Sequence, residues 1–244
     1  MGASSEKHHD TIIEIFKNFG GSGRILDAPA GQGEIARKLM DAGFQVDAAD
    51  ISPELCEVPG LKCEKVDLNH DLPYEAEFFD YVLCAGGMEF LEDQYHFIRE
   101  CYRILKPTGK ILITIPNVLN LKSRVANLLT GFPLFHARPH NEVGSYFGQN
   151  INMVSYFDLR INLHRNGFRI IVVTTSSYAK TAVFFSFLVP FVYLATHRSF
   201  RREKGSEQRE RNREIVRHVL SGDLLFGKKL LILAEKDSHF LKSS

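Results

Sequence analysis

The stretch that decides the fold is Arg24–Ala36, RILDAPAGQGEIA. A short apolar run ends at Asp27, a glycine loop follows, and residues that favour a helix come next. A strand, a glycine loop and a helix in this order open a nucleotide-binding α/β unit. Gly31, Gly33 and Ala36 also fit the G-x-G-x-x-G/A pattern of a dinucleotide site. Asp27 is a poor neighbour for a pyrophosphate, so the loop leaves the choice of cofactor open.

The rest of the chain alternates between the two types of secondary structure. Hydrophobic periodicity and Gly/Pro punctuation predict helices over 10–19, 34–40, 93–105 and 155–165. The same signals predict strands over 24–26, 44–49, 61–66, 81–84, 110–115, 168–174 and 228–236. Strands that alternate with helices indicate an α/β fold, in which a parallel sheet carries helices on both faces.

Three aspartates stand at or just after the predicted ends of strands: Asp27, Asp50 and Asp67. In open α/β sheets, ligands bind beyond the carboxyl ends of the strands. A ligand with an amino-acid end, a ribose and an adenine offers a partner to each: an ammonium group to Asp27, hydroxyls to Asp50 and an exocyclic amine to Asp67. S-adenosylmethionine is such a ligand, and we predict it as the cofactor.

Six stretches carry a resemblance to a known family. They are LDAPAGQGEIA, VDAADIS, KVDLNHDLPY, FDYVLCAGGMEFLED, RILKPTGKILITIPN and NGFRIIVV, and they cover roughly Ile25 to Thr174. In order and spacing they resemble the motifs of class I S-adenosylmethionine-dependent methyltransferases. The resemblance implies a Rossmann-like, seven-stranded, mostly parallel sheet whose last strand, Lys229 to Lys236, is antiparallel, with helices on both faces.

The resemblance also assigns residues to the cofactor. It implies that Asp27 and the Gly31–Gly33 backbone hold the methionine end, that Asp50 holds the ribose, and that Asp67 and Leu68 hold the adenine. The full predicted cofactor set is Asp27, Ala28, Gly31, Gly33, Asp50, Ile51, Asp67, Leu68, Cys84 and Ala85. Two positions depart from the family's pattern: Pro29 stands where a glycine is common, and Phe90 stands where many small-molecule members carry a histidine. The second departure removes one candidate for a general base.

The acceptor side is predicted to lie in a long insertion, residues 117–150, between the fifth strand and the next helix. A connection of this length is commonly a functional lid or carries structure of its own, here a short helix over 121–129. The candidates for acceptor binding or general-base catalysis are His136, His140, Glu142 and Tyr146, although a single loop histidine is more often a surface residue than a catalyst. No cluster of ligands supports a metal, and none is predicted.

A second insertion, residues 181–222, is apolar and then basic. Its apolar part, Ala182 to Ala195, reads AVFFSFLVPFVYLA, and several arginines follow it. A helix from Thr181 to His197 would span about 26 Å, less than the roughly 30 Å hydrocarbon core, and Pro190 is expected to interrupt it. Two interpretations stay open: peripheral contact with a membrane through 182–202, or a helix buried against the sheet or a partner subunit.

The composition of the chain describes an ordinary globular protein. Its length of 244 residues favours one domain over 1–244, which the resemblance implies is a methyltransferase domain. The residues are 44% hydrophobic and 24% charged, and the net charge of +1 gives no general attraction to nucleic acid. The first residues, MGASSEKHHD, lack the apolar core of a signal peptide, so we expect a cytoplasmic protein that could sit at the inner face of the membrane. A homodimer is compatible with the sequence.

The sequence thus predicts a methyltransferase for a small-molecule, lipid-linked or glycan-linked acceptor, with transfer to oxygen. Two alternatives remain at this point. One is an NAD-dependent oxidoreductase, which Asp27 disfavours, and the other is a catalytically silent regulatory protein that binds S-adenosylmethionine.

Overall fold

The computed structural model describes residues 3–132, 152–203 and 205–237. The chain divides into two compact units. The first comprises Met1–Ile115, Ser145–Val172 and Leu231–Ser244, and the second comprises Pro116–Gly144 and Val173–Leu230. We call them the cofactor unit and the helical unit; the extent of one functional domain over 1–244 stays a prediction.

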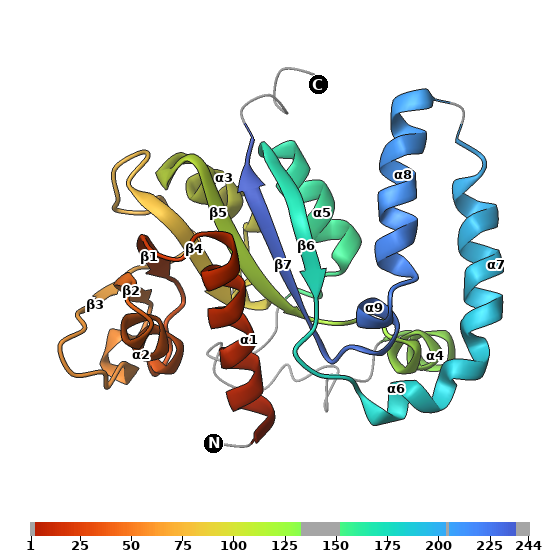
Figure 1. The fold of residues 1–244 in the computed structure, drawn as a ribbon, viewed down its shortest axis with the longest axis horizontal. Helices are drawn as coiled ribbons and strands as arrows, with labels where there is room; N and C mark the ends of the chain where they lie inside the picture. The colour runs from red at the N-terminus through yellow and green to blue at the C-terminus, as the bar shows by residue number, and fades with distance from the viewer. Residues whose placement is uncertain (1–2, 133–151, 204, 238–244) are drawn as a thin grey trace. The chain divides into compact units, whose positions relative to one another are not determined.

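A seven-stranded sheet organises the fold (Figure 1). In spatial order its strands are β3 (Cys63–Lys65), β2 (Gln45–Asp50), β1 (Arg24–Asp27), β4 (Phe79–Ala85), β5 (Leu105–Pro116), β7 (Lys229–Lys236) and β6 (Phe168–Thr174). The pairs from β3 to β5 are parallel, whereas β7 runs antiparallel between β5 and β6. The predicted fold class is confirmed, and the strand order reverses between β1 and β4, where such sheets bind ligands.

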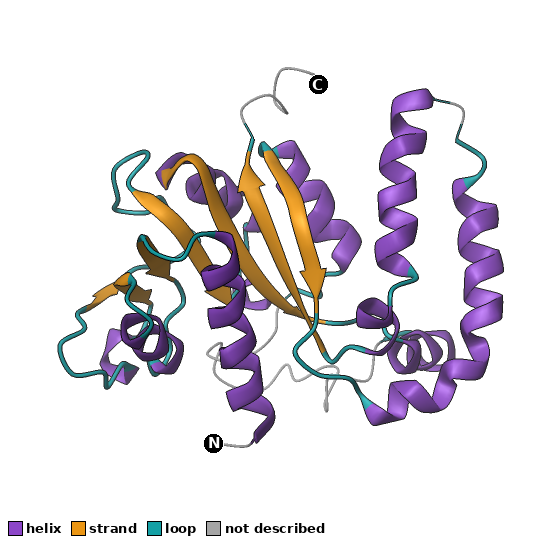
Figure 2. Ribbon diagram, viewed as in Figure 1, coloured by secondary structure: helices purple, strands orange, loops and turns teal. Residues whose placement is uncertain are grey.

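Helices cover both faces of the sheet within the cofactor unit (Figure 2). One face carries α1 (Ala3–Phe19) and α2 (Glu34–Asp41), and the other carries α3 (Gln94–Ile104) and α5 (Tyr156–Arg165). The central strands are accordingly apolar on both sides. In β4, for example, Val82, Leu83 and Cys84 are all fully buried.

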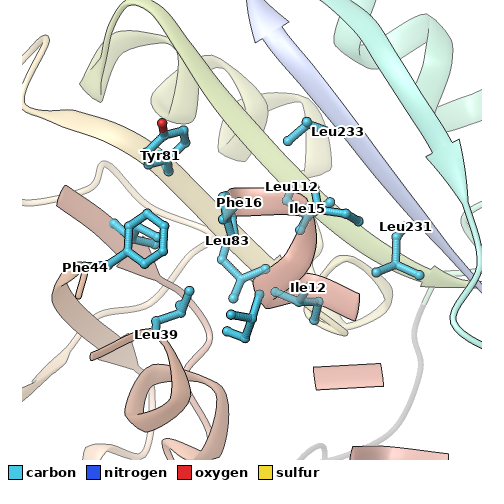
Figure 3. Packing of buried hydrophobic residues seen from close by; sticks show 12 residues of the cluster. Ile12, Ile15, Phe16, Leu39, Phe44, Tyr81, Leu83, Leu112, Leu231 and Leu233 are labelled. Atoms are coloured by element: carbon cyan, nitrogen blue, oxygen red, sulfur yellow. The ribbon is translucent and has the colours of Figure 1, made fainter. Parts of the chain in front are cut away.

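The core beneath α1 is built around aromatic rings (Figure 3). Phe16 of α1 lies edge-on to Tyr81 of β4 with ring centroids 5.3 Å apart, and Phe44 meets both rings at 6.3 and 6.1 Å. Such edge-to-face contacts favour a defined geometry beyond the burial of area alone. This packing fixes α1 against β1 and β4, the two strands that flank the point where strand order reverses.

Several predicted boundaries were wrong. The strand expected over 61–66 is only β3, because Gly60 takes a φ of 79° and ends a turn just before it. The strand expected over 110–115 begins at Leu105, with Thr108 at a φ of 63°. The first helix starts at Ala3 rather than at residue 10, because His8 and His9 are buried with its apolar face.

The helical unit contains shorter segments held together by side chains that cap backbone groups. Its elements are α4 (Leu121–Thr130), α6 (Lys180–Phe184), η3 (Phe185–Leu188), α7 (Val189–Phe200), α8 (Ser206–Val219) and α9 (Gly222–Phe226). The amide of Asn117 donates to the carbonyl oxygens of Leu224 and Gly227 at 2.9 and 3.0 Å. This buried amide joins the chain before α4 to the end of α9.

The structure of the apolar segment contradicts one expectation. Pro190 does not interrupt it, because it occupies the first turn of α7, where a helix needs no backbone N–H at that position. Helical structure therefore continues over Lys180–Phe200, which by length and composition could cross a membrane. Of the two interpretations left open, burial against the sheet is not what the described residues show, because Phe184, Phe191 and Leu194 are 74, 70 and 69% exposed. Contact with a membrane or with a partner subunit stays open.

Candidate functional site

A pocket of about 620 Å³ opens beyond the carboxyl ends of β1, β2 and β4, entirely within the cofactor unit. Its volume falls within the range of about 300 to 1,000 Å³ typical of small-molecule sites. The lining residues are Asp27, Pro29, Ala30, Gly31, Ile35, Asp50, Ile51, Leu55, Val66, Asp67, Leu68, Asn69, Ala85, Gly86, Gly87, Phe90, Leu91 and Glu92. The pocket therefore brings the three predicted aspartates together, between apolar walls.

Asp27 is the unusual group of the site. It ends β1, its side chain is 1% exposed, and neither carboxylate oxygen has a hydrogen-bond partner among the described residues. Burial, with a smaller contribution from the charge of Asp50, raises the pKa of Asp27 from 3.8 to about 8. A buried carboxylate without a partner is costly, so this position suits a ligand that brings a cation.

Asp50 fixes the glycine loop to the end of β2. Its two oxygens accept hydrogen bonds from the backbone N–H groups of Gly31 at 2.8 Å and of Ser52 at 2.9 Å. Each carboxylate oxygen has two acceptor positions, so Asp50 can hold the loop and still accept a hydroxyl from a ligand. The loop and the pocket wall are therefore preorganised by the same side chain.

Asp67 follows β3, the strand that pairs with β2, and takes part in a second hydrogen-bond network at the pocket. Its carboxylate accepts from the backbone and side-chain N–H groups of Asn69 at 3.0 and 3.1 Å, and the oxygen of the Asn69 amide accepts from the backbone N–H of Glu92 at 2.7 Å. Burial opposes ionisation, but these bonds and the nearby His70 lower the pKa of Asp67 overall. Asp67 stays ionised as an acceptor, and Asn69 joins the loops that follow β3 and β4.

The structure places most, but not all, predicted cofactor residues at the pocket. Those that line it are Asp27, Gly31, Asp50, Ile51, Asp67, Leu68 and Ala85. Ala28 and Cys84 do not line the pocket and are fully buried. Burial also raises the pKa of the Cys84 thiol above its ordinary value. Gly33 instead packs against the side chains of Cys56 and Val58, where a Cβ would lie 2.5 Å from Val58.

Sequence reasoning missed Gly87 and Asn69 as site residues. An added Cβ at Gly87 would lie 2.4 Å from the ring of Pro29, so Gly87 accommodates the proline that replaces the family's usual glycine. Phe90, flagged as a departure, lies at the pocket as an apolar wall. The pair of Pro29 and Gly87 could not be read from spacing, because 58 positions separate them and only the fold brings them together.

The acceptor-side candidates His136, His140, Glu142 and Tyr146 lie outside the described residues, so their roles stay predictions. Where the description resumes, the backbone N–H of Asn152 donates to the carbonyl oxygen of Glu89 at 3.1 Å, and its amide donates to that of Leu91. Leu91 lines the pocket. Among the described residues there is no group of three or more His, Cys, Asp or Glu that could hold a metal ion.

The three carboxyl groups of the pocket fit a ligand made of an amino acid, a ribose and an adenine better than they fit a dinucleotide. A pyrophosphate near the Gly31 loop would face the carboxyl groups of Asp27 and Asp50, whereas an ammonium group would pair with Asp27. Ile51 and Leu68 supply apolar surface for an adenine between the two further acceptors. The fold and the pocket thus define a Rossmann-like α/β protein built to hold a nucleoside cofactor with a cationic end.

Comparisons with known proteins give the same class. Residues 26–113 match the family model described as a methyltransferase domain. A ubiquinone biosynthesis O-methyltransferase of Xanthomonas oryzae pv. oryzae is 35% identical over 103 residues, which are 38% of this chain and 43% of that protein. A ubiquinone/menaquinone biosynthesis C-methyltransferase of Citrifermentans bemidjiense is 28% identical over 106 residues, 38% of this chain and 45% of the relative. The matches thus span less than half the length of these curated relatives.

The fold also has solved counterparts. A Thermotoga maritima protein titled SAM-dependent methyltransferase, possible histamine N-methyltransferase, superposes with a TM-score of 0.58 at 17% identity, over 96% of this chain and 91% of that one. At this identity the likeness concerns the fold. The family match over 26–113 lies in the region that holds the pocket, and this region is similar in sequence to methyltransferase domains and similar in fold to S-adenosylmethionine-dependent methyltransferases.

Proposed function

We propose that this protein transfers a methyl group from S-adenosylmethionine to a small-molecule, lipid-linked or glycan-linked acceptor, at oxygen. The observation that carries the proposal is the side chain of Asp27, which lines the pocket, is 1% exposed and has no hydrogen-bond partner in the part of the chain that the structure describes. An ammonium group supplies the charge that this position lacks. The family match over 26–113 supports the same cofactor.

The positions of the residues in the pocket support the following roles for them in our proposal. Asp27 pairs with the amino group of the methionine end, and the backbone at Gly31 approaches its carboxylate. Asp50 accepts from the ribose hydroxyls with the lone pairs that Gly31 and Ser52 leave free. Asp67 accepts from the adenine amine, and Leu68 packs on the ring. When bound, S-adenosylmethionine supplies a methyl group activated by its sulfonium.

Positioning can carry most of the rate for such a donor. Near-attack geometry can contribute on the order of 7 to 11 kcal/mol, whereas a general base typically adds about 100-fold to 10,000-fold. A base is required only when the acceptor must lose a proton, as a phenol or a sugar hydroxyl does. For an oxygen acceptor we assign this task to one of His136, His140, Glu142 or Tyr146. The chain leaves this segment beside the pocket, because the amide of Asn152 donates to the carbonyl oxygen of Leu91 at the pocket wall.

The apolar walls and the relatives' names favour an acceptor with apolar character. Phe90, Leu55 and Leu91 line the pocket beside the three carboxylates, so a substrate that enters beyond the cofactor meets hydrocarbon. The relatives named above are quinone-biosynthesis enzymes, one an O-methyltransferase and one a C-methyltransferase. These names support a lipid-linked ring as acceptor, and a phenolic oxygen on such a ring would use a base from the insertion.

The deciding experiment incubates the protein with methyl-labelled S-adenosylmethionine and a cell extract, followed by separation into organic, aqueous and precipitated macromolecular fractions. An Asp27→Asn variant serves as the control that should lose the label. Label in the organic fraction supports a lipid-linked acceptor, and label in the aqueous fraction a soluble metabolite or a free glycan. The bond type follows from the stability of the labelled product: an oxygen-linked methyl is released by ether or ester cleavage, whereas a carbon-linked one is not.

The two alternatives have their own signatures in binding assays. Saturable thermal stabilisation by NAD, with none by S-adenosylhomocysteine, would establish the oxidoreductase. Stabilisation by S-adenosylhomocysteine without transfer to any fraction of a complete extract would establish the silent regulatory protein.

A further inference from the structure

The helical unit exposes a continuous row of apolar side chains. Phe184, Phe187, Phe191 and Leu194, here called the apolar stripe, follow one another at intervals of three or four residues, which places them on one side of the helical run Lys180–Phe200. All four are more than half exposed. Exposed phenylalanines that gather in this way mark a surface built for an apolar partner.

A groove widens this surface towards α4. Its volume is about 410 Å³, and it lies between Val125 and Leu129 of α4 and the side chains of Phe184 and Phe185. Leu128 and Leu129 on the same helix are 84 and 77% exposed. The apolar stripe and the groove share Phe184, so they form one apolar face with room for a hydrocarbon chain.

Basic residues stand at both ends of the apolar stripe. Lys180 precedes it, and Arg198, Arg201 and Arg202 follow it, all exposed. No described carboxylate forms an ion pair with any of the three arginines. An apolar face bounded by cations at both ends is complementary to a layer of anionic headgroups above hydrocarbon.

We propose that the apolar stripe and Arg198, Arg201 and Arg202 bind the surface of an anionic phospholipid bilayer, with the groove beside α4 receiving an acyl chain. This inference concerns a surface of the helical unit and does not rest on methyl transfer. A second copy of the chain suits the face less well, because it would bring further uncompensated arginines and Lys180 to the interface.

The position of α8 argues for lying on the membrane rather than crossing it. α8 packs along α7, and its sequence, SEQRERNREIVRHV, carries four arginines and three glutamates. If α7 spanned the bilayer, these charges would enter the hydrocarbon with it, at a cost that a helix in the interface avoids. The structure therefore favours insertion of the stripe to the depth of the headgroup boundary.

The test is flotation of the full chain with vesicles. Vesicles of phosphatidylcholine alone are compared with vesicles that also contain phosphatidylglycerol, at low and at high salt. We expect binding to the anionic vesicles only, weakened by salt. Because each arginine near an anionic surface contributes about five-fold, the triple variant R198Q/R201Q/R202Q should bind roughly a hundred-fold more weakly.

A second variant tests the apolar contribution. Phe187→Ser with Phe191→Ser removes two rings of the stripe and should abolish flotation, whereas Ile161→Ser, at a comparably exposed apolar residue of α5, should leave it unchanged. Thermal melts of all variants verify folding. S-adenosylhomocysteine should raise the melting temperature of each variant as much as it raises that of the wild type, which shows that the cofactor site is intact in the variants.

Three outcomes would overturn the proposal. One is the absence of flotation with any vesicle. Another is concentration-dependent dimerisation that the double serine variant abolishes without any vesicle binding, which would assign the face to a second copy. A third is resistance of the membrane-bound protein to high-salt and alkaline extraction from cells, which would show that the segment spans the bilayer.

Discussion

The two units of the chain place side chains in opposite kinds of unfavourable environment. In the cofactor unit, an ionisable group, Asp27, is buried with no hydrogen-bond partner among the described residues. In the helical unit, apolar groups such as Phe184 and Phe191 are exposed without cover. Both arrangements are unfavourable in water for the protein alone.

The difference indicates how large a partner must be to stabilise the side chains of each unit. A single buried carboxylate is relieved by one ammonium group in a closed pocket, which selects a small ligand. A row of exposed rings is relieved only by an extended apolar surface. These features agree with the small ligand proposed for the cofactor unit and with the apolar surface proposed as the partner of the helical unit, and the predictions below separate the two.

The largest effect is expected for Asp27→Asn. Loss of the buried charge that pairs with the ligand's ammonium should weaken binding of S-adenosylhomocysteine by about 3 kcal/mol, roughly 150-fold. Isothermal titration measures it. Asp47→Asn, at a β2 residue that pairs with Arg24 outside the pocket, is the matched control and should bind nearly as the wild type does. Equal affinities of the wild type and Asp27→Asn would remove Asp27 from the site.

The same variant should gain stability without ligand, in a pH-dependent way. The pKa of Asp27 is raised from 3.8 to about 8, so the stability associated with the neutral acid is fully present below pH 4 and is lost as the pH rises towards 8. Asp27→Asn escapes this loss. Its free energy of unfolding should exceed that of the wild type by about 2 to 4 kcal/mol at pH 8, after about 1 to 3 kcal/mol for the unpaired amide. Near pH 4, where the acid of the wild type is neutral as well, only the cost of the amide remains and the variant should be the less stable protein by about 1 to 3 kcal/mol.

A further consequence concerns protons. Below pH 8 the free protein holds Asp27 protonated, whereas the ligand's ammonium favours the carboxylate. Binding of S-adenosylhomocysteine at pH 7 should therefore release close to one proton, and affinity should rise as the pH approaches 8. Calorimetry in two buffers of different ionisation enthalpy measures the release, and an unchanged heat in both buffers would contradict it.

A smaller effect is expected for Gly87→Ala. The new Cβ would lie 2.4 Å from the Pro29 ring, and overpacking of this kind costs about 1 to 3 kcal/mol of stability. Chemical denaturation measures it, and the pair Gly87→Ala with Pro29→Ala should recover much of the loss. Gly222→Ala is the control, since its Cβ would make only an ordinary contact at 3.8 Å. Additive losses in the double variant would mean that the two residues do not form one fit.

Next comes Asp50→Asn. The amide keeps one acceptor oxygen for Gly31 or Ser52 but offers the ribose a weaker, neutral partner. We expect S-adenosylhomocysteine to bind about 1 to 2 kcal/mol more weakly, roughly 5- to 30-fold. If affinity is unchanged while the melting temperature falls, Asp50 only holds the glycine loop.

The parts of the site that depend on local chemistry could be predicted from the sequence. Asp27, Asp50 and Asp67 stand at or just beyond strand ends, and parallel strands bring their carboxyl ends to one edge, so their meeting follows from the alternation of strands and helices. Gly87 and Asn69 could not be predicted in this way. Their roles arise from contacts with Pro29 and with Glu92 that depend on how separate loops meet.

The helical unit shows the opposite limit. The apolar pattern of 182–195 was clear, but the pattern of a buried helix and that of a membrane-binding helix are the same in sequence. Only the exposure of Phe191 and Leu194 separates them. The predicted interruption at Pro190 was wrong because a proline breaks a helix in its interior but is compatible with the first turn, where Pro190 lies in α7.

The smallest effect is expected for a single change in the apolar stripe. Phe191 is 70% exposed, so Phe191→Ser should change the free energy of unfolding by less than about 0.5 kcal/mol and leave S-adenosylhomocysteine binding unchanged. The matched control is Phe97→Ala in α3, which removes a fully buried ring and should cost about 3 to 5 kcal/mol. Urea denaturation of both variants gives the comparison. A loss of several kcal/mol at Phe191 would mean that the ring is covered in solution, because an exposed phenylalanine has no burial to lose, and the membrane surface proposed here would then be an internal contact of the protein.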